Sequence, residues 1–330
     1  IHAVVNRIKT IEKETIFITN ILYLYKTFPI FKAISKFGLQ YCCIGNYPIG
    51  TFPTERNAPS YIFKNLFKKN NLKHIISKLY RIGLKIPIHY YGVNYAKYSF
   101  IIGGFRANMV GPLINKKTQK VRIHSLDYDI YLRLKKKSKK YKKNNYIVFI
   151  DQYLPFHPDF LVEKKTESID ADQYYNDLRN YFDHIELIST QKVIIAAHPK
   201  ADYTGNEKLF GFRDIVYGYN SAELINASSL VLIHFSSAIS LVILFNKPVQ
   251  FITSIILNKT KMGTYITAIA NYFNQKPINI NRLNDDLLID KVNLKKYSAY
   301  ISEYIKNPST IDTPVWEQLI DIINQDNYQS

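Results

Sequence analysis

The chain has 330 residues, of which 47% are hydrophobic and 21% charged, a balance that excludes a disordered protein and allows a sizeable buried core. Lys and Arg total 44 against 26 Asp and Glu, so the formal net charge is +18. That charge would attract a polyanion, but the joint excess of Lys, Asn, Ile and Tyr is explained equally well by an AT-rich genome. The two cysteines, Cys42 and Cys43, are adjacent, which indicates a reducing compartment without thiol chemistry.

The length fits two domains of ordinary size. Residues 1–30 contain no apolar run long enough to cross a bilayer, and charged residues from Lys9 to Glu14 interrupt any signal-peptide core. We therefore expect a soluble or peripheral protein.

The first half alternates strand and helix signals. Residues 15–20 are a short β-branched run, residues 24–38 have helical spacing closed by a glycine, and residues 39–46 have the pattern of a second strand. This alternation predicts a parallel sheet. A long basic amphipathic helix is expected over residues 61–81.

Residues 97–104 are a further strand that ends in Gly103 and Gly104. Open α/β sheets bind ligands at the carboxyl ends of their strands. The spacing matches neither a dinucleotide fingerprint nor a P-loop. We expect this glycine pair to let a ligand approach the backbone closely.

Eight of the eleven residues from Arg133 to Lys143 are basic. Such a run repels itself and does not enter a core, so it is the best candidate for a linker. The apolar strand pattern restarts at residue 145. We therefore expect domains at 1–143 and 144–330.

The second half holds four near-continuous apolar runs separated by helical patterns. Strands of this kind are buried on both faces, which predicts a doubly wound parallel sheet. The expected strands are 145–151, 193–197, 230–234 and 248–253, and the expected helices are 171–186, 220–227 and 236–245.

His198 and Pro199 directly follow the strand at 193–197. The histidine would stand at the carboxyl edge of the sheet, where an imidazole binds or protonates a phosphate, and Lys200 would add a positive charge. A plain strand-ending loop is the alternative interpretation.

Ser236 and Ser237 follow the strand at 230–234 and precede a helical run. Their hydroxyls and the free N–H groups of the helix would form an anion site. We expect this strand tip to be the neighbour of the tip that carries His198. An ordinary serine cap is the alternative.

Together these stretches resemble the nucleotide-binding half of bacterial GT-B glycosyltransferases that use CMP-activated acidic sugars. Sialyltransferases of this kind carry an HP motif and then an SS motif, present here as His198-Pro199 and Ser236-Ser237, and the resemblance covers residues 145–253. A similar half occurs in the CDP-glycerol phosphotransferases of teichoic acid synthesis, whose DYSS and KPV stretches look like HFSS and NKPV here. The resemblance implies an α/β protein of GT-B type, with two Rossmann-like domains facing each other across a cleft.

The resemblance also implies roles for further residues. The histidine and the serines would contact the donor phosphate. Backbone of the loop 210–220, including Tyr217 and Gly218, would read the cytosine, and Glu223 would reach the ribose.

The acidic pair followed by glycine that sialyltransferases often show is absent, because Asp285 and Asp286 precede Leu287. We expect Asp151, at the end of the strand 145–151, to supply the catalytic carboxylate. It would deprotonate an acceptor hydroxyl or attack the anomeric carbon. A loop-capping role is the alternative, and His157 and Asp159 are weaker candidates.

Asp127 and Asp129 belong to a His-Ser-x-Asp-Tyr-Asp segment that resembles a stretch of predicted surface-polysaccharide transferases. We expect them on one side of an extended segment, either orienting an acceptor or, as we favour, serving as a structural hinge. No spacing typical of a metal site is present, so we expect metal-independent chemistry without a cofactor.

These features predict a glycosyltransferase that moves an acidic sugar, such as sialic, legionaminic or pseudaminic acid or Kdo, from its CMP donor to a surface glycan of the capsule, lipooligosaccharide or O-antigen. A CDP-glycerol or polyol phosphotransferase is the alternative within the class. The basic stretches would hold the enzyme on the anionic inner face of the cytoplasmic membrane.

A nucleic-acid-binding protein is the alternative of another class. It is less favoured, because the tyrosines are spread over the whole chain and no RRM, KH or zinc-finger signature occurs. A non-catalytic scaffold that keeps the fold without activity is also possible.

Overall fold

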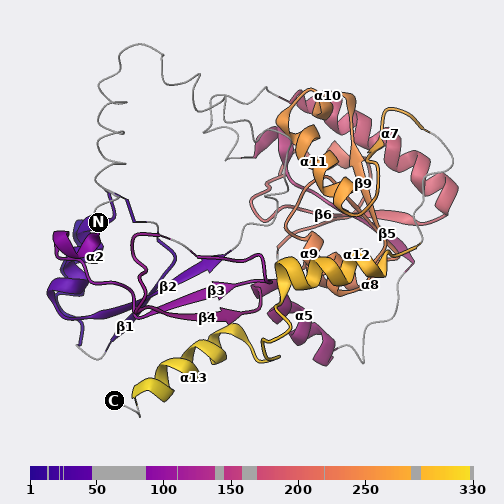
Figure 1. Ribbon diagram of the computed structural model, residues 1–330. Helices are drawn as coiled ribbons and strands as arrows, with labels where there is room; N and C mark the ends of the chain where they lie inside the picture. The colour runs from indigo at the N-terminus through magenta and orange to yellow at the C-terminus, as the bar shows by residue number, and fades with distance from the viewer. Residues whose placement is uncertain are drawn as a thin grey trace, which may run out of the picture. The chain divides into compact units, whose positions relative to one another are not determined.

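The computed structural model describes residues 1–12, 15–21, 23–24, 26–46, 87–109, 111–137, 145–157, 169–218, 220–283 and 291–327 (Figure 1). Contacts divide the described chain into two compact units. The first holds residues up to Ser125 together with those from Lys306 onward, and the second holds Leu126 to Ile305.

This division differs from the predicted boundary near residue 143. Helix α5 (Leu126–Lys137) contacts two helices of the second unit, α8 (Ser221–Ala227) and α9 (Ile239–Leu244). Its side chain Leu134 is 1% exposed. The first part of the lysine run is therefore the last turn of a helix. Basic residues there interact favourably with the helix dipole. Residues 138–144 lie outside the described chain.

The first unit is built on a four-stranded parallel sheet. Its strands lie in the order β1-β2-β3-β4 and have the bounds Ile16–Thr19, Gln40–Asn46, Tyr98–Ile102 and Gln119–Ile123. The first three confirm the predicted strands. The fourth was not predicted, because its sequence QKVRI is polar and its side chains are mostly exposed.

Side-chain alternation along β2 sends apolar groups to both faces of this sheet. Tyr41 and Cys43 pack in one cluster with helix α2 (Phe28–Lys36), to which Ile8 at the end of α1 (His2–Ile8) also belongs. Cys42 packs on the other face against Leu319 of α13 (Val315–Asn327). The unit is thus a three-layer α/β/α arrangement.

The second unit contains a six-stranded parallel sheet with the order β10-β9-β8-β5-β6-β7. The four predicted strands are confirmed, and the two added edge strands are two residues long. In chain order, β5 to β10 span Tyr146–Ile150, Lys192–Ala196, Ile215–Val216, Leu230–Ile233, Val249–Thr253 and Ile278–Asn279.

Helices cover both faces of this sheet (Figure 1). Helix α7 (Ala171–Ser189) packs its aromatic stripe on one face, together with α10 (Ile255–Asn258) and α11 (Lys261–Tyr272). Helices α5, α8 and α9 contact one another, and α9 also contacts α12 (Leu294–Tyr300). A π-helical turn, Ile301–Ile305, follows α12.

Helix α7 shows how sequence sets these elements. Asp170 caps its start by accepting a hydrogen bond from the Gln173 amide at 2.9 Å. Tyr174, Leu178 and Phe182, at spacings of four residues, are all fully buried.

Both units are therefore α/β folds with parallel sheets, as predicted, and the cleft between them stays a prediction. The expected helix 61–81, Asp159 and the pair Asp285-Asp286 lie outside the described residues. Among the helices that the structure describes, none is long and apolar enough to cross a membrane.

Candidate functional site

Six of the predicted site residues lie beyond the carboxyl ends of β6, β5 and β8. These three strands are parallel, so their carboxyl ends meet at one edge of the sheet. His198 follows β6, Asp151 follows β5, and Ser236 and Ser237 follow β8.

The order of these strands differs from what we expected. We predicted that the tips bearing His198 and Ser236 are neighbours, but β5 lies between β6 and β8. Since adjacent strands lie about 4.8 Å apart, the two tips are separated by about 10 Å at the backbone. The loop after β5 therefore occupies the centre of the site.

The loop after β6 holds His198 in a defined orientation. The His198 carbonyl accepts a hydrogen bond from the Ala201 amide at 2.8 Å, which closes a tight turn. Its Nδ1 accepts from the Lys200 amide at 3.2 Å. In the neutral ring the proton is then on Nε2, which is a donor suited to a phosphate oxygen. Pro199 and the Lys200 side chain are exposed.

His157 lies next to His198. The two rings are 4.9 Å apart, centre to centre, at 65° to each other, and both are half-buried. The sequence offered a signal for this pair, because His157-Pro158 follows β5 as His198-Pro199 follows β6. The structure thus brings the imidazole of His198 together with that of His157, which we had ranked as a weaker candidate.

The serine pair lies in a turn and not at a helix start. Helix α9 begins at Ile239, and the Ser236 Oγ accepts a hydrogen bond from the Ala238 amide at 3.3 Å. The Ser236 carbonyl accepts from the Ile239 amide and the Ser237 carbonyl from the Ser240 amide, each at 3.2 Å. The serines thus precede the helix without capping it, and an anion site at these two residues stays a prediction. Ser237 is exposed and Ser236 half-buried.

Asp151 is not placed as a catalytic carboxylate should be. It is 2% exposed, and the Tyr203 hydroxyl donates to its Oδ2 at 2.7 Å. The backbone amides of Tyr153 and His198 donate to Oδ1 at 2.8 Å and to Oδ2 at 3.3 Å.

Burial raises the pKa of Asp151 above its ordinary value, and the hydrogen bonds from Tyr203 and the backbone oppose that rise. In this structure the carboxylate is covered and accepts three hydrogen bonds, so it is not open to an acceptor hydroxyl or an anomeric carbon. The geometry thus favours the loop-capping alternative over the predicted base or nucleophile.

The next residue, Gln152, was not predicted. Its Oε1 accepts from the Phe235 amide at 2.7 Å, and its Nε2 donates to the Phe235 carbonyl. Nothing in the sequence pattern indicates this role.

The loop predicted to read the base is divided by β7. Tyr217 and Gly218 come after this strand, at the same sheet edge as His198, and Tyr217 is 45% exposed. Gly218 has a φ of +84°, a conformation that favours glycine. Glu223 is half-buried in the first turn of α8. These three residues remain candidates for the nucleoside.

The first part of that loop lies at the opposite end of the sheet, because Arg213 precedes β7. Its guanidinium is bound to Asp183 at 2.6 Å and to Glu186 at 2.7 Å. Arg213 is therefore a structural residue at the sheet edge opposite to His198.

In the first unit, Gly103 and Gly104 are buried beyond the end of β3. Gly103 has a φ of +126°, and its amide donates to the Ile123 carbonyl at 2.8 Å. The Arg122 guanidinium donates to the Ala107 carbonyl at 3.0 Å across the same loop. The positive φ of this turn is enough to explain why residue 103 is a glycine, and no bound ligand is needed for that explanation.

Asp127 and Asp129 lie in the first turn of α5, and not on an extended segment as we expected. Acidic side chains there interact favourably with the helix dipole. Burial raises the pKa of Asp127 to about 6, and the nearby Ser240 hydroxyl acts in the opposite direction. His124, just before this helix, is fully buried, and its Nε2 lies 2.8 Å from the Thr313 carbonyl. The segment is thus tied into the core.

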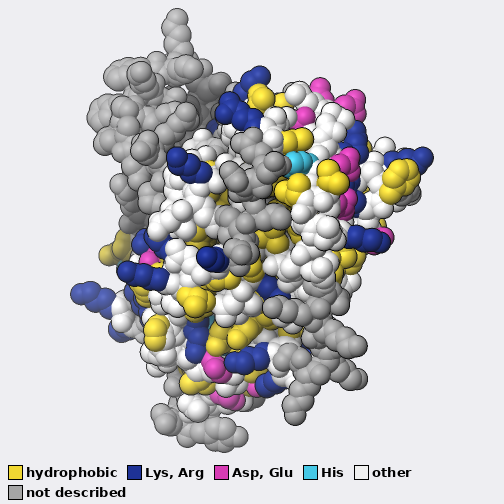
Figure 2. Space-filling view, turned by 90° about the vertical axis from the view of Figure 1, so that its right-hand side faces the viewer, with side chains coloured by type: hydrophobic (Ala, Val, Ile, Leu, Met, Phe, Trp, Pro, Cys, Tyr) yellow, Lys and Arg dark blue, Asp and Glu magenta, His cyan; other side chains and the backbone are white. Residues whose placement is uncertain are grey.

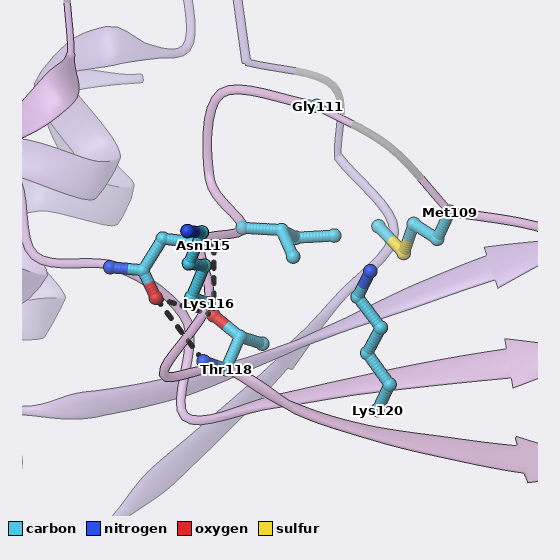
Figure 3. Close-up of a pocket in the computed structure, with 7 residues that line it drawn as sticks. Met109, Gly111, Asn115, Lys116, Thr118 and Lys120 are labelled. Carbon is cyan, nitrogen blue, oxygen red and sulfur yellow. Dashed lines mark hydrogen bonds between the residues drawn. The ribbon is translucent and has the colours of Figure 1, made fainter.

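A hollow of about 660 Å³ lies on the first unit, and the sequence did not predict it (Figure 3). Asn115 Oδ1 accepts hydrogen bonds from two backbone amides of its own turn, and Thr118 Oγ1 donates to the Ala96 carbonyl at 2.9 Å. The ammonium groups of Lys116 and Lys120 are its cationic elements. Its lining is Met109, Gly111, Ile114, Asn115, Lys116, Thr118 and Lys120.

The described residues contain no cluster of three or more His, Cys, Asp or Glu side chains that could hold a metal ion. The edge of the second sheet therefore offers imidazole, hydroxyl and backbone donors as its chemical groups.

No protein-family model matches the chain, and no curated protein matches it. Among solved structures, it is similar to UDP-GlcNAc 2-epimerase from Methanocaldococcus jannaschii, with 11% identity and a TM-score of 0.45 over 98% of this chain and 81% of that one. It is also similar to a variant of the wall teichoic acid polymerase TagF, with 15% identity and a TM-score of 0.45 over 95% and 73% of the two chains. A third similar structure is the glycotransferase of kitacinnamycin, with 9% identity and a TM-score of 0.43 over 94% and 71%.

Proposed function

We propose that this chain is a transferase that uses a nucleotide-activated donor, whose phosphate binds at the carboxyl edge of the second sheet. The observation that supports this most is the placement of His157, His198 and the Ser236-Ser237 turn beyond three adjacent parallel strands. This edge is where open α/β sheets bind nucleotides.

The chemistry follows from the groups at that edge. When the donor breaks, its phosphate oxygens gain negative charge, and hydrogen-bond donors fixed in advance stabilise that charge. His198 presents Nε2–H for this purpose, and Lys200 and the serine hydroxyls are further candidates. The proton of the acceptor hydroxyl must go to a base, and we assign that role to His157 in place of Asp151.

For the donor we propose a cytidine nucleotide, on the basis of the HP and SS motifs. In the first form of the proposal, the transferred group is an acidic sugar and the reaction is glycosyl transfer to a surface glycan. The nucleoside would lie against Tyr217, Gly218 and Glu223. CMP is the product that leaves.

A second form is transfer of a polyol phosphate from a CDP-activated donor, which also releases CMP. One observation favours it. Asp151, the carboxylate expected to serve the anomeric carbon, is buried and bonded. The half-buried imidazoles of His157 and His198 remain at the edge, and they serve attack on phosphorus as well as on carbon.

Nucleic-acid binding has less support. The face in Figure 2 shows Lys and Arg side chains dispersed among other types and not gathered in one stripe. Tyrosines that could stack on bases are instead packed in the core, among them Tyr174, Tyr175, Tyr181, Tyr203 and Tyr300.

Calorimetric titration of the full chain with CMP, CDP, UMP and UDP tests the proposal. We expect the cytidine nucleotides to bind at least tenfold more tightly than the uridine nucleotides. Tighter binding of UMP and UDP would overturn the cytidine assignment. Absence of binding by all four would overturn the transferase proposal.

The two forms are separated by incubating the enzyme with CMP-sialic acid or with CDP-glycerol, each with a glycan acceptor, and measuring CMP release. Release from the first donor alone supports glycosyl transfer. Release from the second alone supports polyol phosphate transfer.

A further inference from the structure

We propose that Asp151 and Gln152 are paired positioning residues that hold the loops on the two sides of β5 at the spacing the donor phosphate requires. The inference rests on the proposed function, since it concerns the same edge of the sheet. It gives Asp151 a role different from direct catalysis and gives a role to Gln152, which no motif indicated.

Backbone pairing stops before the site begins. The ladder between β5 and β6 ends at Ile150 and Ala196, and the ladder between β5 and β8 ends at Ile150 and Ile233. Beyond that point, one further bond joins the Asp151 amide to the Ala196 carbonyl, at 3.1 Å. Side-chain hydrogen bonds from the residues after β5 join it to the two outer loops.

Asp151 holds the loop on the β6 side at both of its ends. Its Oδ2 accepts from the His198 amide at 3.3 Å and from the Tyr203 hydroxyl at 2.7 Å. These two residues bracket the turn that carries the imidazole. The carboxylate is a pure acceptor, so it can satisfy both donors at once.

Gln152 holds the loop on the β8 side. Its primary amide accepts from the Phe235 amide and donates to the Phe235 carbonyl. Both backbone groups of the residue before Ser236 are thereby fixed. A leucine would make neither bond, and a carboxylate would make only the first.

The two residues are consecutive and directly follow β5, so one short segment links both loops. Any shift of that segment would change the distance between His198 and the serine turn. Misplacement of about 1 Å in such a site costs up to a hundredfold in rate. This is the physical reason to expect an effect on ligand binding and turnover in addition to stability.

The test uses the full chain carrying Asp151→Asn, Gln152→Leu or Gln152→Glu. Asp177→Asn and Gln250→Leu serve as matched controls, because both residues are buried in the same unit, one in α7 and the other in β9. For each protein, CMP affinity is measured by calorimetry and stability by urea unfolding. Each measurement is repeated in the His198→Ala background.

We expect Asp151→Asn and Gln152→Leu to weaken CMP binding about tenfold and Gln152→Glu to weaken it less. Asp151→Asn should weaken it by less than twofold once His198 is already alanine, because its effect passes through that residue. The controls should bind CMP as tightly as wild type.

A second readout follows the loops directly. In Asp151→Asn, hydrogen exchange should speed up at the His198 amide and stay unchanged at the Phe235 amide. In Gln152→Leu, it should speed up at the Phe235 amide and stay unchanged at the His198 amide. If wild type binds CMP and both variants bind it equally well when folded, the inference is overturned while the proposed function stands. If wild type binds no nucleotide, both are overturned.

Discussion

The rings of His157 and His198 lie 4.9 Å apart, centre to centre, at an angle of 65°. They come from loops that follow two adjacent strands of one parallel sheet, β5 and β6. The pair can therefore divide phosphate binding and proton acceptance between its two rings.

We predict that His157→Ala and His198→Ala each lower turnover by about a hundredfold or more, the range typical of general acid–base groups. Only His198→Ala should also weaken nucleotide binding strongly. CMP release and calorimetry measure the two effects. His89→Ala, an exposed histidine of the first unit, is the control, and equal activity of all three variants would remove the pair from the mechanism.

His234 makes the stability of the second unit depend on pH. It is fully buried, its Nδ1 lies 2.7 Å from the Ile252 carbonyl, and its Nε2 lies 3.0 Å from the Tyr174 hydroxyl. Burial lowers the pKa of His234 to about 4. The unfolded chain therefore takes up a proton near pH 6.5 that the folded chain refuses until about pH 4.

Stability should be full above pH 6.5 and fall as the pH drops toward 4, by up to about 3 kcal/mol from this residue. His234→Gln keeps a donor and an acceptor but cannot titrate, so its free energy of unfolding should lack this loss. Urea unfolding at pH 7.5, 6, 5 and 4 measures it. A parallel loss in wild type and variant would show that another group is responsible.

Asp127 has the opposite effect to His234 on how stability depends on pH. Burial raises its pKa to about 6 in the folded chain, above the value of 3.8 for an unperturbed carboxyl. The folded state thus binds a proton more readily than the unfolded state, and this term adds stability as the pH falls from about 6 toward 3.8.

We predict that Asp127→Asn raises the free energy of unfolding at pH 8, because no charge is then buried. The variant should also lose stability more steeply than wild type between pH 6 and 4. Asp129→Asn, two residues along the same helix, is the control and should follow wild type. Identical pH profiles for Asp127→Asn and wild type would contradict the assignment.

The sequence predicts the central strands well, because β5, β6, β8 and β9 are buried on both faces and are apolar throughout. It fails at β4, an edge strand whose side chains face solvent. It also fails at the start of α9, because the Ser236 hydroxyl closes a turn with the Ala238 amide and does not cap the helix.

The site was predicted only in part, because the sequence does not reveal which strands are neighbours in the sheet. Sequence order places β5 before β6 and β8, but only the fold places it between them. That placement makes His157 the neighbour of His198 and turns Asp151 inward to Tyr203. A repeated His-Pro was visible in the sequence, whereas the bonds of Gln152 to a backbone 83 residues away had no signal.

The junction of α10 and α11 offers a further test of the packing. A Cβ on Gly263 would lie 2.6 Å from Asn258 Cα and 2.8 Å from the Leu257 carbonyl oxygen. Both are backbone atoms, which cannot move aside as a flexible side chain would. Gly263 is buried in the first turn of α11.

Replacing a helical glycine with alanine ordinarily stabilises a helix by about 1 kcal/mol. For Gly263→Ala we predict the reverse, a loss of about 1–3 kcal/mol, because the added methyl overpacks the junction. Urea unfolding measures it, and Gly111→Ala is the control, since a Cβ there would meet no atom within 4 Å. A gain in stability for Gly263→Ala would mean that the two helices lie further apart than they do here, since only a wider junction leaves room for the methyl group.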